Sequence, residues 1–261
     1  MAVRAAREVP LRVPATCRPR TARDRDKHEL TESIEEYTEG IYRLQGELAV
    51  VGTGDIARYM RVAPASVTTM LKKLADLGLV AHTPYQGVRL TPKGEALSIS
   101  ILRKHRLLER MLVDFLELPW EDVHELACKL EHYISEDVAD RIAKALDYPQ
   151  TCPHGNPVDA TVEDGSRRLE TCGVGDSVVV AKITDERLEF LTYILEIGLL
   201  PQTPITIRGR SPFGDVLMLE VAGRADPVAV GREVANSVWV QDRQPERNAD
   251  QPTETSAHER R

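Results

Sequence analysis

The spacing of apolar residues becomes helical from about residue 30. In "LTESIEEYTEGIYRLQGEL", apolar residues recur every three or four positions, at Ile34, Tyr37, Ile41 and Leu44. This is the spacing of one face of an amphipathic helix. Thr31 stands ahead of that face, where a hydroxyl can accept a hydrogen bond from the first helical turn. The pattern therefore predicts an amphipathic helix with Thr31 as its N-cap.

Two short helices, a tight turn and a hairpin follow in that order. The pattern predicts a helix over 53–60, a turn over 61–65 and a second helix over 66–77. Gly78 stands where a helix commonly ends. The next stretch, "LVAHTPYQGVRLT", has two short strand-like segments around Gly87, which predicts a hairpin. The order predicts a winged helix-turn-helix, whose second helix is sized for a DNA major groove.

The remainder divides into a helical part and a strand-rich part. Residues 96–146 predict one long helix, a second helix that begins at Pro119 and a third that Ser135 caps. Residues 148–172 contain three prolines and few apolar residues, which indicates a linker. Beyond Gly173, short segments alternate apolar and polar residues, with one helix between the first two. This part predicts a small β-barrel of about 70 residues.

Charge is distributed unevenly along the 261 residues. The formal net charge is −7 at pH 7, which by itself disfavours a nucleic-acid partner. Residues 1–27, however, carry eight basic and three acidic residues, a net charge of +5, whereas residues 28–241 carry −11. The basic arm is interpreted equally well as a solvated tail and as a segment that touches DNA.

Composition excludes several other classes of protein. No apolar run approaches the ~18–20 residues of a membrane span, so a cytosolic location is expected. Aromatic residues make up 5% of the chain, which argues against binding single strands by base stacking. The four cysteines are too few and too scattered for a disulfide framework.

The second helix of the helix-turn-helix has small and hydroxyl-bearing residues at its start and lysines one turn later. Short side chains can approach base edges, and cationic side chains nearby can contact phosphates. The candidate DNA-binding residues are Arg58, Ala65, Ser66, Thr68, Thr69, Lys72, Lys73 and Arg89. Because short hydroxyl residues specify bases weakly, we expect thymine methyl groups and DNA shape to contribute to specificity. A winged helix used only for protein contacts is the alternative.

Two segments, "RKHRLLER" and "HELACKLEH", repeat metal-ligating residues every four positions, which puts them on one face of a helix. The candidate ligands are His105, Glu109, His124, Cys128, Glu131 and His132. Imidazoles, carboxylates and a single thiolate suit Mn(II) or Fe(II) better than a closed structural zinc site. Satisfied core side chains, or a reactive-cysteine enzyme built on Cys128, are the alternatives. So many such groups on two neighbouring helices favour a metal site.

The first predicted helix offers two further carboxylates, Glu36 and Glu39, three residues apart. If they reach the same metal, the ion joins the predicted helices of residues 96–146 to the helix that leads into the helix-turn-helix. His154, in "CPHGNP", is interpreted as structural because Gly155 and Pro157 shape a turn there. The spacing gives no support to a metal role for Cys152 or Cys172.

At these motifs the chain resembles the diphtheria-toxin-repressor and manganese-transport-regulator family of metal-dependent transcriptional repressors. The resemblance covers roughly residues 30–241 and rests on "SVTTMLKKLADLGLV", "LTPKGEAL", "RKHRLLER", "VHELACKLEHYIS" and "PHGNP", in the family's order. It implies a homodimer formed through the helical domain and an SH3-like third domain, which also resembles the small FeoA module. It further implies that metal-loaded dimers bind palindromic double-stranded operators and shut off metal-uptake genes.

The expected fold is mainly α with a β-rich C-terminal domain. We expect a disordered basic arm at 1–28, a winged helix-turn-helix DNA-binding domain at 29–96, a helical metal-binding and dimerisation domain at 97–150, a linker at 151–172, an SH3-like (FeoA-like) β-barrel at 173–241 and a disordered tail at 242–261.

The resemblance assigns ligands differently in the two branches of the family. In the iron-responsive branch, Cys128, Glu131 and His132 match the regulatory site, where Glu36 replaces a methionine, and His105, Glu109 and His124 match the ancillary site. Glu186 and Glu189 match the third domain's ligands only loosely. In the manganese branch, Glu36, Glu39 and His105 match, but a carboxylate stands in place of Cys128.

The chain therefore combines features of both branches. We expect Mn(II) or Fe(II), with a slight preference for Mn(II), and up to two ions per subunit. The sequence favours a repressor that is not an enzyme. A metal-dependent hydrolase that uses the His, Glu and Cys cluster, an iron-transport accessory protein and a metal-responsive activator are the rival interpretations.

Overall fold

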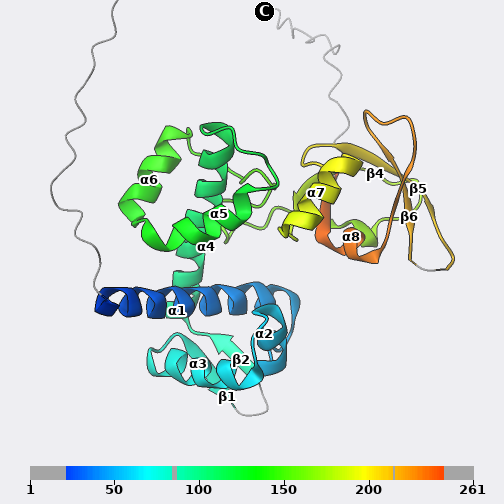
Figure 1. The fold of residues 1–261 in the computed structure, drawn as a ribbon. Helices are drawn as coiled ribbons and strands as arrows, with labels where there is room; N and C mark the ends of the chain where they lie inside the picture. The colour runs from blue at the N-terminus through cyan, green and yellow to red at the C-terminus, as the bar shows by residue number, and fades with distance from the viewer. Residues whose placement is uncertain (1–21, 84–86, 214, 244–261) are drawn as a thin grey trace, which may run out of the picture. The chain divides into compact units, whose positions relative to one another are not determined.

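The chain folds into two compact units in a computed structural model, which describes residues 22–83, 87–213 and 215–243 (Figure 1). The first unit extends to Glu95 and the second begins at Ala96. Of the predicted disordered arm and tail, residues 1–21 and 244–261 lie outside the described residues. The prediction is wrong for the described ends, because residues 22–28 belong to a helix and Asp242 to a strand. Among the described helices, none combines the length and the apolar character that a membrane span requires.

The first unit has the element order of a winged helix-turn-helix. Its elements are α1 (Ala22–Glu47), α2 (Thr53–Tyr59), α3 (Pro64–Asp76), β1 (Val80–Thr83) and β2 (Gly87–Leu90). The two strands pair antiparallel, as predicted. Gly78 has a φ of +69° just after α3, which confirms it as the residue that ends this helix. The prediction of Thr31 as an N-cap is wrong, because α1 begins at Ala22 and Thr31 lies inside it.

Apolar side chains from all three helices form the core of this unit. Ile41 of α1, Ile56 of α2 and Leu74 of α3 are each at most 1% exposed. The hairpin is tied to α1 because the side-chain carbonyl of Gln45 accepts a hydrogen bond from the Leu90 backbone N–H at 2.7 Å. The core holds one face of α3 inward and leaves its other face in solvent.

The second unit opens with a helical part. Its elements are most of α4 (Pro92–Asp114), then α5 (Val123–Leu130), the 3₁₀ turn η1 (Glu131–Tyr133) and α6 (Glu136–Ala145). The Ser135 hydroxyl accepts a hydrogen bond from the Val138 backbone N–H, which confirms Ser135 as the N-cap of α6. The helix predicted from Pro119 begins only at Val123, four residues later. Leu108, Leu112 and Ala127 pack together between α4 and α5.

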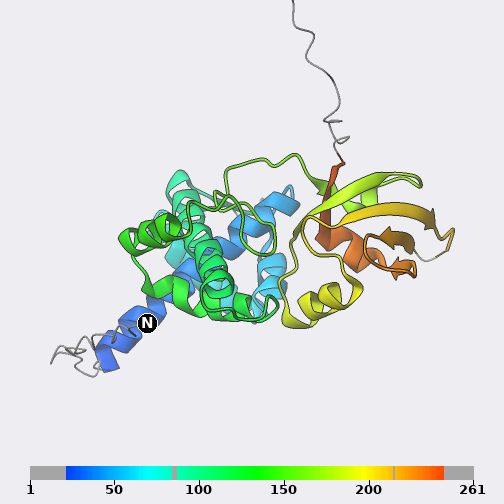
Figure 2. The same cartoon turned by 90° about the horizontal axis from the view of Figure 1, so that it is seen from above.

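The strand-rich part of this unit is an antiparallel sheet. Its elements are β3 (Arg167–Arg168), the 3₁₀ turn η2 (Leu169–Thr171), β4 (Ser177–Ile183), α7 (Leu188–Ile197), β5 (Pro204–Arg210), β6 (Leu217–Val221), β7 (Val228–Val230), α8 (Arg232–Ser237) and β8 (Val238–Asp242). The strand order is β3-β8-β4-β5-β6-β7 (Figures 1 and 2). Among the described strands, β3 pairs only with β8 and β7 only with β6, so the predicted barrel closure is not seen.

The predicted linker contains a packed loop. Cys152 and His154 are at most 1% exposed. The loop is tied to β4, because the Ile183 backbone N–H donates to the His154 carbonyl at 2.9 Å and the Asn156 amide donates to the Ile183 carbonyl at 2.9 Å. A Cβ on Gly155 would lie 2.1 Å from the Ala181 carbonyl oxygen, so only glycine allows this close approach. Residues 152–156 are thus fixed against the sheet.

Candidate metal centre

A cluster of buried polar side chains lies where α4 and α5 meet this loop. His105 and Glu109 stand one turn apart on α4 and are 1% and 0% exposed. His124 and Cys128 stand one turn apart on α5. Burial of charged groups is costly unless they are paired or coordinate a metal. Such a cluster in an otherwise apolar core therefore indicates a functional site.

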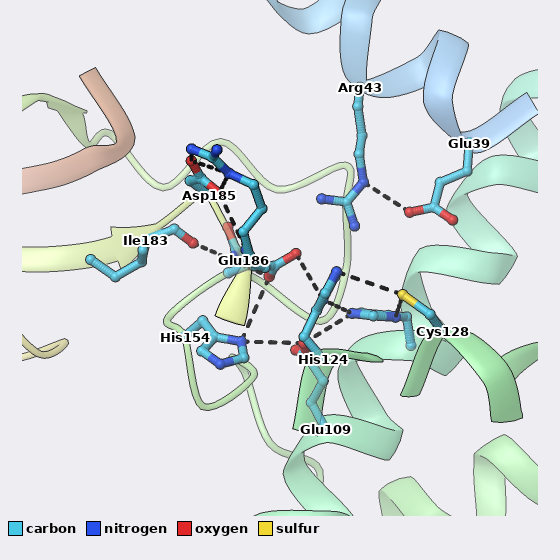
Figure 3. A network of polar contacts seen from close by, with 12 residues as sticks. Glu39, Arg43, Glu109, His124, Cys128, His154, Ile183, Asp185 and Glu186 are labelled. Atoms are coloured by element: carbon cyan, nitrogen blue, oxygen red, sulfur yellow. Dashed lines mark hydrogen bonds and ion pairs between the residues drawn. The ribbon is translucent and has the colours of Figure 1, made fainter. Parts of the chain in front are cut away.

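Glu109 lies among three imidazoles (Figure 3). Its Oε1 atom is 2.9 Å from Nε2 of His105, 3.3 Å from Nδ1 of His124 and 3.2 Å from Nδ1 of His154. The other nitrogen of His105, Nδ1, is 2.7 Å from Oε2 of Glu131. The structure thus brings together three of the predicted ligands, His105, Glu109 and His124, and adds His154 to them.

Cys128 borders the same imidazoles. Its sulfur is 3.6 Å from Nε2 of His124 and 3.9 Å from Nδ1 of His105. Burial raises the pKa of this thiol, but the contacts with His105 and His124 outweigh burial and leave the pKa below its ordinary value. A thiolate is thereby favoured, and the thiolate is the form that binds metals.

His154 and Cys152 belong to the cluster, although neither was predicted from the sequence to be a metal ligand. The Nδ1 atom of His154 is 3.7 Å from Oε1 of Glu186, and Cys152 joins these two residues and Glu109 in one compact donor group. Glu186, which the resemblance matched only loosely, lies in this group, whereas Glu189 is exposed on α7 and lies in none of the groups formed by the described residues. The signal for His154 was its spacing of two residues from Cys152 in a loop shaped by Gly and Pro.

The pKa values in the cluster are set by opposing effects. Burial disfavours the charged form of each group, but the neighbouring charges outweigh it. Glu109 holds the pKa values of His105 and His154 well above the ordinary imidazole value, and Glu186 raises the pKa of His124 to about 9. The imidazoles hold the pKa of Glu109 well below its ordinary value. The carboxylates therefore favour positive charge here, whether protons on the imidazoles or a bound cation.

The donor atoms fit a divalent transition metal. Among the described residues, three groups bring one donor atom from each member within 4.8 Å of one another: His105, His124 and Cys128; His105, Glu109, His124 and Glu186; and Glu109, Cys152, His154 and Glu186. Oε2 of Glu109 and Nδ1 of His154 are buried and have no hydrogen-bond partner among the described residues. Orphaned lone pairs beside imidazole and thiolate donors are what Mn(II) or Fe(II) ligation requires.

The remaining predicted ligands lie on other elements. Glu131 is 3% exposed on η1, and its Oε1 is 3.5 Å from Nε2 of His132. These two residues follow Cys128 within one turn, as the sequence predicts. Glu36 and Glu39 lie on α1 in the first unit, where Glu39 accepts a hydrogen bond from Arg43 at 2.8 Å. Their part in a metal site stays a prediction.

The predicted DNA-binding residues share the solvent face of the helix-turn-helix. Val67, Leu71 and Leu74 bury one side of α3. On the other side, Ala65, Ser66, Thr68, Thr69 and Lys72 are exposed, Lys73 is half-buried, and Arg58 and Arg89 are exposed on α2 and β2. The hydroxyls of Thr68 and Thr69 donate to carbonyls one turn earlier, which leaves their methyl groups as apolar contacts. The face has the mixed cationic and apolar character of a major-groove reader.

Family models match nearly the whole of the described chain. Residues 29–88 match the iron-dependent repressor N-terminal DNA-binding domain, and residues 91–159 match the iron-dependent repressor metal-binding and dimerisation domain. Residues 167–242 match the FeoA domain. These matches agree with the positions of the helix-turn-helix, the buried cluster and the sheet.

Individual relatives extend this likeness over most of the chain. The iron-dependent repressor IdeR of Mycobacterium tuberculosis is 33% identical over 230 residues, which cover 82% of this chain and 99% of the relative. The diphtheria toxin repressor of Corynebacterium diphtheriae is 30% identical over 65% of this chain and 75% of its own length. A manganese-dependent transcriptional repressor solved with manganese has a TM-score of 0.74 at 30% identity and covers 80% of this chain and 99% of its own. ScaR solved with bound Cd²⁺ has a TM-score of 0.71 at 30% identity, over 80% and 99% of the two chains.

Proposed function

Because this chain belongs to the family of iron-dependent repressors, we propose that it represses transcription by binding DNA through α3 when the centre on α4 and α5 holds its metal. The observation that carries the proposal is that one chain holds both a buried donor cluster, in its second unit, and a helix-turn-helix with an exposed cationic face, in its first unit. The ion stabilises the arrangement of the two units in which a dimer fits its operator, so metal affinity and DNA affinity are coupled.

The proposed metal is Mn(II) or Fe(II). Relatives of both kinds, named iron-dependent and manganese-dependent, match this chain at similar identity. The proposed regulatory ligands are Cys128, Glu131 and His132, with Glu36 and Glu39 supplied by α1. The carboxylates favour Mn(II) and the thiolate favours Fe(II). The ancillary ligands are His105, Glu109, His124 and Glu186, which the structure groups together.

The assembly is proposed to be a cytoplasmic homodimer on a palindromic operator in double-stranded DNA. The match of residues 91–159 to a dimerisation domain supports the dimer, and two copies of α3 would then read two half-sites. The described donors His105, Glu109 and His154 are at most 1% exposed. A hydrolase needs a cleft that admits substrate to its metal, so this burial argues against the enzymatic alternative.

Lys72 tests the placement of the DNA-binding face. We expect Lys72→Glu to weaken binding to an operator duplex about tenfold or more. The slope of log affinity against log salt concentration should also become shallower by about one, which corresponds to the loss of one phosphate contact. Fluorescence anisotropy in Mn(II) measures both, with a duplex selected from a random-sequence pool by the Mn(II)-loaded protein. Bound metal, measured by elemental analysis, stays unchanged.

Lys144→Glu is the matched control, since Lys144 is exposed on α6 in the second unit and the charge change is the same. The control should retain operator affinity. Equal affinities of the Lys72 variant and the unmodified protein would refute α3 as the recognition helix.

A further inference from the structure

The carboxylate of Glu186 faces two donor sets at once. Its Oε2 atom is 3.4 Å from Nδ1 of His124, on α5. Its Oε1 atom is 3.7 Å from Nδ1 of His154, in the packed loop, and accepts a hydrogen bond from the Asn156 amide at 3.0 Å. A carboxylate whose two oxygens face different nitrogen donors has the geometry of a bridge between two metal ions.

Glu109 is the other residue that the two sets share. Its Oε1 atom faces His105, His124 and His154, while its buried Oε2 atom has no hydrogen-bond partner among the described residues. One oxygen thus faces the imidazoles of both sets, and the other has free lone pairs. The sets His105–Glu109–His124–Glu186 and Glu109–Cys152–His154–Glu186 have these two carboxylates, and no other residue, in common.

The loop presents His154 as a ligand in a fixed orientation. Nε2 of His154 donates a hydrogen bond to the Trp120 carbonyl at 3.0 Å. A carbonyl only accepts, so Nε2 carries a proton, and Nδ1 is the nitrogen that faces Glu109 and Glu186 and that would bind a metal in place of its own proton. The Trp120 indole N–H also donates to the Pro153 carbonyl at 2.9 Å, which anchors the loop next to His154.

Cys152 completes the second set with a buried sulfur. It is 1% exposed, and its backbone N–H donates to the Asn156 carbonyl at 2.9 Å, which closes the loop into a tight turn. Burial and the nearby carboxylate of Glu109 raise the pKa of this thiol, so it would give up its proton only to a bound metal. A thiolate sulfur, an imidazole nitrogen and carboxylate oxygens then form a donor set of the kind that borderline divalent metals accept. It is distinct from the set of two imidazoles and two carboxylates on the helices.

We propose that Glu109 and Glu186 bridge a pair of divalent ions, one held by His105 and His124 and the other by Cys152 and His154. The proposal rests on the metal-binding function proposed above and adds a second ion to the ancillary site. Two ions that share carboxylates in a dry site lie about 4 Å apart. The pair connects the helices of the second unit to the loop fixed on its sheet, so its occupancy stiffens that unit.

Metal counting tests the pair. Mn(II) bound per chain is measured by elemental analysis after chelator treatment, reloading and removal of free metal. We expect Cys152→Ala/His154→Ala and His105→Ala/His124→Ala each to lose one Mn(II) per chain. We also expect electron paramagnetic resonance to show a spin-coupled Mn(II) pair that is absent from both variants. If both variants bind as much Mn(II) per chain as the unmodified protein, a single ion uses either donor set, and the proposal is overturned. The absence of a spin-coupled pair from the reloaded unmodified protein would also overturn it.

A second measurement keeps every histidine and carboxylate of the cluster and changes only sulfur atoms. In a Cys128→Ala background, Co(II) should give a near-ultraviolet thiolate band that Cys152→Ser removes and Cys172→Ala retains. Cys172 is also buried but contacts Arg167 and lies in none of the donor groups. Persistence of the band in Cys152→Ser would overturn the assignment of Cys152. Metal-stimulated DNA binding by the unmodified chain, measured in parallel, is independent of these outcomes and separates failure of the pair from failure of the proposed function.

Discussion

Replacing Cys128 with alanine is expected to abolish the increase in operator affinity that metal produces. The half-buried sulfur lies within 4 Å of two imidazole nitrogens. Cys128 stands one turn before Glu131 and His132 along the chain. Without the thiolate, the regulatory set loses an anionic donor. We expect metal affinity to fall on the order of 100-fold, at or above the loss that follows removal of an outer-shell partner.

The fold should survive this change, because alanine is the strongest helix former and Cys128 lies within α5. Anisotropy of the labelled operator duplex with Mn(II) and with chelator gives the stimulation directly. Circular dichroism and sedimentation would check that the variant is a folded dimer. Cys172→Ala serves as the matched control and should keep full stimulation. If Cys128→Ala responds to Mn(II) as the unmodified protein does, the regulatory ligand assignment is wrong.

Gly155→Ala is expected to destabilise the second unit by about 3 kcal/mol. Gly155 has a φ of +87°, a region that costs other residues about 1–2 kcal/mol. An added Cβ would also lie 2.1 Å from the Ala181 carbonyl oxygen, so the loop must move off β4. Hydrogen bonds between the loop and Ile183 would then weaken, each worth about 1 kcal/mol.

Gly223→Ala provides the comparison, since Gly223 has a φ of +84° but open space around its added Cβ. Gly223→Ala should therefore lower the free energy of unfolding only by the cost of placing alanine at a positive φ, about 1–2 kcal/mol. Both tryptophans of the chain, Trp120 and Trp239, lie in the second unit, so urea unfolding followed by tryptophan fluorescence in chelator reports on this unit. Equal losses of stability in the two variants would show that the close approach of Gly155 to β4 contributes nothing.

Local spacing predicted the parts of this structure that local interactions determine. The end of α3 near Gly78 and the cap at Ser135 depend on residues a few positions apart, and the structure confirms them. The turn between α2 and α3 is also present, but α3 begins at Pro64, two residues before the predicted start at 66. The start of α1 could not be predicted from local spacing. Residues from Ala22 are mainly polar and lack an apolar stripe, yet they continue the helix begun by the periodic segment.

Sequence spacing predicted only part of the donor cluster, for a different reason. His105 and Glu109 were predicted because helical spacing fixes their relative position whatever the rest of the chain does. His154 reaches Glu109 only through tertiary contacts. Its Nε2 donates to the Trp120 carbonyl, its own carbonyl accepts from the Ile183 backbone N–H, and Gly155 approaches β4 closely. No periodic signal encodes such contacts, so a Cys and a His in a loop rich in Pro and Gly were interpreted as parts of a linker.

The barrel prediction failed for a related reason. Alternating apolar residues correctly predicted strands β4 to β8 and the helix α7 between the first two. Closure, however, depends on whether the edge strands meet, and β3 and β7 each pair on one side only among the described strands. The alternation of apolar and polar residues determines which residues of a strand face the core, but it does not determine whether the two edge strands pair with each other.

The central claim is that metal binding controls DNA binding, and an anaerobic titration tests it most directly. Chelator-treated protein is mixed with the selected operator duplex, and anisotropy is followed as Mn(II), Fe(II) or Mg(II) is added. We expect Mn(II) or Fe(II) to raise operator affinity by about 5- to 150-fold, the usual range of coupling between sites, and Mg(II) to have little effect. Equal affinity in chelator and in saturating Mn(II) and Fe(II) would contradict it.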